Sequence, residues 1–183
     1  MIANVLTIAG TDPSGGAGIQ ADIKTMSALG AYSCSVVTAV VAQNTCGVRS
    51  FQALSPDFVA AQIDAVLEDV RIDAVKIGMI ANAGIAGAVA DRLTHHRARN
   101  IVLDPVMVAK SGHALLDPEA VSAVRDSLVP LARVIPPTLP EAVVLLDRDD
   151  GEENGEDRQR DALEAAASGH EGTTRRRRPY VPT

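Results

Sequence analysis

The most constraining feature of this sequence is an apolar run followed by a glycine-rich turn and a helical pattern, within residues 4–24. The run Val5–Ala9 is typical of a strand buried on both faces of a parallel sheet. The turn Gly10–Gly18 contains Pro13 and four glycines, which permit positive φ and close approach to the backbone. Backbone amides at the start of the following helix then favour a polar or anionic group. We therefore expect a binding site at this turn.

The helix after the turn carries a carboxylate beside its apolar stripe. Ile19, Ile23, Met26 and Leu29 recur at helical spacing and predict a buried face, and Asp22 lies at its edge. A carboxylate in that place needs a hydrogen-bond donor, so Asp22 either caps the adjacent loop or serves as a ligand group. The spacing alone favours the structural role.

Residues 35–43 are β-branched and apolar up to the last one, which predicts a buried strand ending in the amide of Gln43. Ligands of open α/β sheets bind at the carboxyl ends of the strands. An amide both donates and accepts hydrogen bonds, so Gln43 suits the edge of a heteroaromatic ring. The alternative, that Gln43 holds the turn 44–47, has equal weight.

Two later strands also end in informative residues. Residues 74–79 predict a strand that ends at Met79, where core filling is the favoured role over a ligand wall. Residues 101–107 predict another strand, in which Asp104 holds Mg²⁺ through water or orients a phosphate, with capping of the next turn as an equal alternative. Lys110 follows in a polar loop, where a lone lysine is usually solvated but can meet a phosphate.

Helix-start signals separate these strands. Ser55-Pro56-Asp57, Asn82 and Asp117-Pro118-Glu119 each predict a helix N-terminus. Thr138 and Glu141 have the spacing of a capping box, which explains both without catalysis.

Strand and helix alternate about five times, ending with a short strand at 133–135. This order predicts an α/β fold with a doubly wound, mainly parallel sheet, helices on both faces and right-handed crossovers. His95 and His96 are expected at an exposed helix end. Neither GxxxxGK[ST] nor GxGxxG is present, so the motifs do not support a Walker-type loop or a dinucleotide site.

Composition limits the remaining classes. With 183 residues, of which 46% are hydrophobic, the chain predicts one main domain, placed at 1–146, followed by a charged and disordered tail at 147–183. A net charge of -6 argues against nucleic acid as a partner. No membrane-length run or signal segment is evident, which predicts a cytoplasmic protein without membrane partners. Cys34 and Cys46 are interpreted as reduced thiols without an assigned role.

Five stretches together resemble the hydroxymethylpyrimidine/phosphomethylpyrimidine kinases of thiamine biosynthesis, members of the ribokinase-like superfamily. The resemblance covers about residues 4–146 and is carried by the stretches Ala9–Asp22, Val41–Thr45, Lys76–Met79, Asp104–Gly112 and Leu139–Ala142. It implies a kinase that uses ATP and Mg²⁺ to phosphorylate the hydroxymethyl group of 4-amino-5-hydroxymethyl-2-methylpyrimidine and then the resulting phosphate. The partner is thus a small pyrimidine, with a homodimer among the open options.

The resemblance also assigns site residues, and it reverses the preferences for Asp22, Gln43 and Met79. Asp22 and Gln43 are placed on the polar edge of the aminopyrimidine. Met79 and Val106 lie against its faces, and Gly10 closes over it. Asp104 and Glu141 act near Mg²⁺ and the phosphates, with Lys110 as a phosphate contact. Phosphoryl transfer needs alignment and positive charge more than covalent chemistry, which agrees with this set.

Two departures from the family pattern bear on activity. The family usually has asparagine at the position of Thr138, and it continues into a Gly-Thr-Gly-Cys segment that supplies the anion hole and the cysteine at the reacting hydroxyl, which this sequence lacks. We therefore expect a C-terminally truncated or frameshifted chain of low activity and marginal stability, whose catalytic residues are unknown. The alternatives are a catalytically silent pyrimidine-binding fragment and a pyridoxal/pyridoxine-type vitamin kinase.

Overall fold

The computed structural model describes residues 2–106, 118–138, 141–142 and 145. The chain divides into two units, residues 1–137 and residues 138–183, and all the elements below belong to the first. The predicted tail at 147–183 and the predicted phosphate contact Lys110 lie outside the described residues.

The centre of the first unit is a parallel sheet of four strands in the order β2-β1-β5-β6. Its strands are β1 (Asn4–Ala9), β2 (Tyr32–Val37), β5 (Ala74–Ile77) and β6 (Ile101–Leu103). The chain moves from β1 to β2 on one side and then returns to place β5 on the other side of β1. The carboxyl ends of β1 and β5 therefore flank the point at which the winding reverses, where ligands bind in such sheets.

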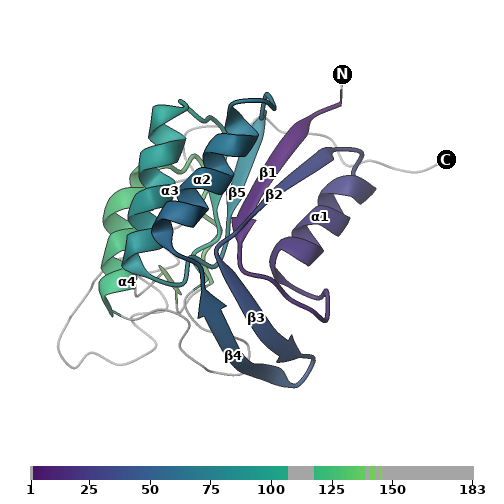
Figure 1. Ribbon diagram of the computed structural model, residues 1–183, viewed down its shortest axis with the longest axis vertical. Coiled ribbons are helices and arrows are strands. Elements are labelled where there is room, and N and C mark those ends of the chain that lie inside the picture. Colours follow the sequence, from purple (N-terminus) through teal and green to yellow (C-terminus); the bar gives the residue numbers. More distant parts are fainter. Residues whose placement is uncertain (1, 107–117, 139–140, 143–144, 146–183) are drawn as a thin grey trace. The chain divides into compact units, whose positions relative to one another are not determined.

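Helices cover both faces of this sheet (Figure 1). Helix α1 (Gly18–Ala28) packs on β1 and β2 from one side. On the other side lie α2 (Pro56–Leu67), α3 (Ala83–His95) and α4 (Pro118–Ala123), packed against one another in that order. A π-helical turn (Val124–Leu128) and a 3-10 turn (Val129–Leu131) extend α4. The predicted doubly wound α/β fold is thereby confirmed.

The predicted strand 35–43 is in fact two strands that belong to different sheets. Strand β2 ends at Val37, and β3 (Ala39–Asn44) pairs antiparallel with β4 (Gly47–Ala53) in a separate ribbon. The break lies at the fully buried Thr38, whose amide donates to the Ala9 carbonyl and whose hydroxyl donates to the Met79 carbonyl. Strand β4 was not predicted, because its residues are largely exposed and carry no continuous apolar pattern.

The core lies between the sheet and the α2–α3 layer. Leu6, Ile8, Ile63, Ile77 and Leu103 are fully buried there. The predicted apolar stripe of α1 is only partly correct. Ile19 is buried, but Leu29 is 82% exposed, because it is the C-cap residue and lies past the last turn that contacts the sheet.

The helix starts predicted at Ser55 and Asn82 are confirmed, and α4 begins at Pro118, while Asp117 lies outside the described residues. Two other predictions are wrong, those for His96 and for the strand at 133–135. Ser55 and Asn82 cap α2 and α3 with their side chains. His96 is not an exposed end, because its Nε2 lies 2.7 Å from Oδ1 of Asp64 and joins α3 to α2. The strand predicted at 133–135 is reduced to a single parallel bridge between Val102 and Val134.

Candidate functional site

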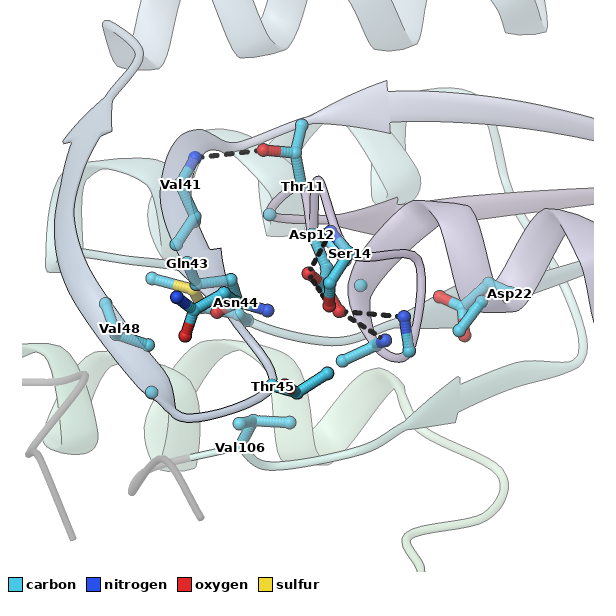
Figure 2. A pocket seen from close by; sticks show the side chains of 18 of the residues that line it. Thr11, Asp12, Ser14, Asp22, Val41, Gln43, Asn44, Thr45, Val48 and Val106 are labelled. Carbon is cyan, nitrogen blue, oxygen red and sulfur yellow. Dashed lines mark hydrogen bonds between the residues drawn. The ribbon is translucent and has the colours of Figure 1, made fainter. Parts of the chain in front are cut away.

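A cavity of about 680 Å³ opens at the carboxyl ends of β1 and β5, beneath the β3–β4 ribbon (Figure 2). It brings together residues from four separate stretches of sequence. All of the predicted pyrimidine contacts line it: Gly10, Asp22, Gln43, Met79 and Val106. Asp104, predicted for the metal side, lines it as well.

The glycine turn forms one wall, and its amides are already occupied. Oδ1 of Asp12 accepts from the amide and hydroxyl of Ser14, and Oδ2 accepts from the amides of Gly16 and Ala17, at distances of 2.7 to 2.9 Å (Figure 2). The expectation that these amides bind a polar or anionic group is therefore correct, but the anion is a side chain of the chain itself. The amides of Ser14, Gly16 and Ala17 are thus used within the chain.

The charge of Asp12 is held in place by these donors. Asp12 is only 2% exposed, and burial by itself raises the pKa of a carboxyl. The nearby amide of Gln43, together with hydrogen bonds from Ser14 and from the backbone, outweighs burial and holds the pKa of Asp12 well below its usual range. Asp12 therefore stays ionised and fixes the shape of the turn.

Close backbone approach explains two of the glycines. Gly18 has a φ of +56°, and a Cβ there would lie 2.4 Å from the carbonyl oxygen of Gly10. A Cβ at Gly10 would lie 3.1 Å from Sδ of Met79. A side chain at Gly18 is therefore incompatible with the approach of the turn to the start of α1, whereas one at Gly10 would require Met79 to move.

Gln43 reaches the cavity from the β3–β4 ribbon and not from the parallel sheet. The register of the ribbon shifts between Ala42 and Gln43, whose partners are Ser50 and Val48. The proposed alternative role for Gln43, holding the turn 44–47, belongs to Asn44, whose Oδ1 accepts from the amide of Cys46. Gln43 instead lines the cavity together with Asp12, and its amide helps to lower the pKa of that carboxyl.

Asp22 has charged and polar partners that differ from those expected. It does not cap the glycine turn, because Asp12 does so. Its Oδ2 accepts from Oγ1 of Thr7 at 2.6 Å and from Nζ of Lys76 at 3.1 Å. Lys76 also lies 3.4 Å from Oδ2 of Asp104. We call Asp22, Lys76 and Asp104 the carboxylate cluster.

Apolar side chains complete the cavity. Met79 lines it while also packing against the core, so the core-filling and wall roles are both met by one side chain. Val41, Val48 and Val106 add apolar surface from the ribbon and from the segment after β6 (Figure 2). The cavity thus combines apolar walls with a few polar groups, as small-molecule sites do.

Glu141 belongs to the second unit and shows the predicted capping arrangement. Its Oε2 accepts from the amide of Thr138 at 2.8 Å and from the hydroxyl of Thr138 at 2.6 Å. Glu141 thus makes its half of the predicted capping box, whereas the Thr138 hydroxyl donates to Glu141. In the part of the chain that the structure describes, no group of three or more His, Cys, Asp or Glu side chains forms a ready metal cage.

Sequence reasoning missed Asp12, Lys76 and Thr7 as parts of the site. Asp12 occurs in the quoted glycine turn, and its position before Pro13-Ser14-Gly15-Gly16 is typical of an Asx turn, which would have indicated the cap. Lys76 interrupts an otherwise apolar strand, and a cation in a buried strand requires an anionic partner. Thr7 shows no comparable signal.

The doubly wound sheet and the mixed polar and apolar cavity define an α/β protein with a small-molecule site. Comparison with known families is more specific. The phosphomethylpyrimidine kinase family model matches residues 12–171. The chain belongs to this family, as the resemblance of its motifs predicted.

Individual proteins similar to this chain are also named as kinases. The chain is 65% identical over 144 residues to a hydroxymethylpyrimidine/phosphomethylpyrimidine kinase of Salmonella typhimurium, covering 79% of this chain and 54% of the relative. A phosphomethylpyrimidine kinase structure from Clostridium difficile 630 is 42% identical with a TM-score of 0.78, covering 91% of this chain and 71% of that one. A Staphylococcus aureus pyridoxal kinase in complex with AMP-PCP and pyridoxal is 31% identical with a TM-score of 0.75, covering 92% and 59%.

The chain spans about half the length of the curated relatives it matches. Of the helices in the described residues, none combines the length and apolar character needed to cross a membrane.

Proposed function

We propose that this chain binds 4-amino-5-hydroxymethyl-2-methylpyrimidine and belongs to an ATP-dependent kinase that phosphorylates this compound and then its monophosphate in thiamine biosynthesis. The observation that carries the proposal is the convergence of Gly10, Asp22, Gln43, Met79 and Val106 on one cavity. Family membership and relatives named for this reaction support it.

The cavity matches the chemistry of an aminopyrimidine. An amino group and ring nitrogens need acceptors and donors along one edge, which the carboxylate of Asp22 and the amide of Gln43 supply. The flat faces need apolar contact, which Met79 and Val106 supply. At Gly10 the glycine turn has no side chain, so its backbone can approach the ring closely.

Asp104 fits the role of a Mg²⁺ ligand. Its carboxylate is 39% exposed, lies at the end of β6 and lines the cavity. Mg²⁺ commonly takes one or two carboxylates together with waters and substrate phosphates, so a complete protein cage is not required. When bound with ATP, the ion would neutralise charge on the transferred phosphoryl group. The roles of Glu141 and Lys110 near metal and phosphate stay predictions from the resemblance.

Calorimetric titration of the 183-residue chain with the pyrimidine, beside an ATP-dependent phosphorylation assay, tests the proposal. We expect saturable binding in a one-to-one ratio. Asp22→Asn should weaken binding by about tenfold or more, because a charged acceptor is replaced by a neutral one. Asp126→Asn is the matched control. It changes an exposed carboxylate in the π-helical turn after α4 and should bind like the unmodified chain.

The outcomes separate the alternatives. Binding with phosphorylation supports the kinase, and binding without it supports a silent pyrimidine-binding fragment. Tighter binding of pyridoxal than of the pyrimidine would favour a pyridoxal-type kinase, in line with the pyridoxal kinase neighbours. Failure to bind the pyrimidine at millimolar concentration would overturn the proposal. A cytoplasmic location and a homodimer stay predictions, which fractionation and sedimentation test.

A further inference from the structure

We propose that Lys76 is a positioning residue that orients Asp22 toward the amino group of the pyrimidine. The inference rests on the proposed function and concerns the cation at the centre of the carboxylate cluster. Asp22 projects from α1, Asp104 follows β6 and Lys76 lies on β5, so one ammonium joins three elements.

Only one oxygen of the Asp22 carboxylate is engaged in hydrogen bonds. The Oδ2 atom of Asp22 accepts from Thr7 at 2.6 Å and from Lys76 at 3.1 Å. Each carboxylate oxygen has about two lone-pair sites, so these donors occupy that oxygen fully. Among the described residues, no donor is bonded to Oδ1, and Asp22 lines the cavity. The second oxygen is thus left for a donor on the ligand.

The positive charge of Lys76 lies close to two negative charges. Asp22 and Asp104 are two carboxylates at the same cavity, and Lys76 lies within 3.4 Å of both. The side chain of Lys76 is 23% exposed and that of Asp22 is 17% exposed, so solvent screens the pair only partly. Without the ammonium, repulsion from Asp104 would disfavour the present orientation of Asp22.

The ammonium of Lys76 packs beside Gly78. A Cβ at residue 78 would lie 2.9 Å from Nζ of Lys76 and 3.1 Å from Cβ of Ala9. The ammonium therefore occupies the space that the absent side chain of Gly78 leaves. Gly78→Ala would displace the ammonium while keeping every charged group of the cluster.

The test compares two ligands on the full chain. One is 4-amino-5-hydroxymethyl-2-methylpyrimidine, and the other is the same compound without the 4-amino group. We expect the unmodified chain to prefer the amino compound by about tenfold, the value of one charge-assisted hydrogen bond. Lys76→Met should abolish this preference by weakening only the amino compound, and Gly78→Ala should reduce it.

Arg71→Met is the matched control, since it removes a cation from an ion pair with Asp73 at the opposite end of β5. It should keep the tenfold preference. A merely structural role of Lys76 would weaken both ligands equally, and that result, or a retained preference in Lys76→Met or Gly78→Ala, overturns the inference. Equal binding of both ligands by the unmodified chain would also overturn it. Absence of binding of either ligand would instead overturn the proposed function.

Discussion

The glycine turn and the carboxylate cluster are neighbouring walls of one cavity, yet their carboxylates are used in opposite ways. Asp12 in the turn is 2% exposed and accepts four hydrogen bonds from its own loop. Asp22 in the cluster accepts two, both on one oxygen. The comparison teaches that occupancy of the oxygens, more than sequence position, separates a carboxylate that builds a wall from one that can bind a ligand.

The largest expected effect is the loss of the Asp12 carboxylate. Asp12→Ala removes the charged acceptor that binds the hydroxyl of Ser14 and the amides of Ser14, Gly16 and Ala17, so we expect a loss of about 3 kcal/mol in the free energy of unfolding. Urea unfolding followed by circular dichroism measures it.

Asp22→Asn is the comparison variant for Asp12→Ala. We expect it to change stability by no more than about 1 kcal/mol while weakening pyrimidine binding, because an amide oxygen still accepts from Thr7. Equal destabilisation by the two variants would show that both carboxylates serve the fold and would remove the distinction.

The next effect concerns the close approach within the turn. Gly18→Ala places a Cβ 2.4 Å from the carbonyl oxygen of Gly10, whereas a Cβ at Gly30 meets nothing within 4 Å. Both glycines have positive φ, so the conformational cost of about 1 kcal/mol is shared. We expect Gly18→Ala to be less stable than Gly30→Ala by about 2 kcal/mol in the same unfolding experiment. Similar losses would mean that the turn adjusts freely.

The smallest effect is the acid sensitivity of the turn. Because the pKa of Asp12 is held below its unfolded value, its ionised form stabilises the fold above about pH 4, and this contribution is lost as the pH falls further. Between pH 5 and pH 3 the unmodified chain should lose about 1 kcal/mol more than Asp12→Asn. Parallel stability curves for the two chains would contradict the assignment of the lowered pKa to this residue.

Local signals in the sequence predicted much of the fold. The apolar run before Gly10 became β1, and the caps Ser55 and Asn82 begin α2 and α3, because these features act over a few neighbouring residues. The prediction of a single strand at 35–43 was wrong because it also rested on a local pattern. Its apolar pattern is continuous, but tertiary hydrogen bonds of Thr38 with Ala9 and Met79 divide it between two sheets.

The candidate site was predicted through motif resemblance and not through spacing. Spacing alone favoured structural roles for Asp22 and Met79 and left Gln43 open. The structure gathers all three around one cavity, while their binding roles stay proposals. Lys76 was not predicted because its partners come from other segments of the chain, whereas Asp12 was missed although its turn carries a local signal.

The sequence by itself determined the alternation of strand and helix outside the β3–β4 ribbon, the glycine turn and the family, since these follow from local periodicity, capping and motif identity. Only the tertiary structure decided that β3 leaves the parallel sheet and that Lys76 stands between Asp22 and Asp104. The reason is physical: hydrogen bonds and ion pairs between distant segments depend on distances of a few ångströms that no local pattern encodes.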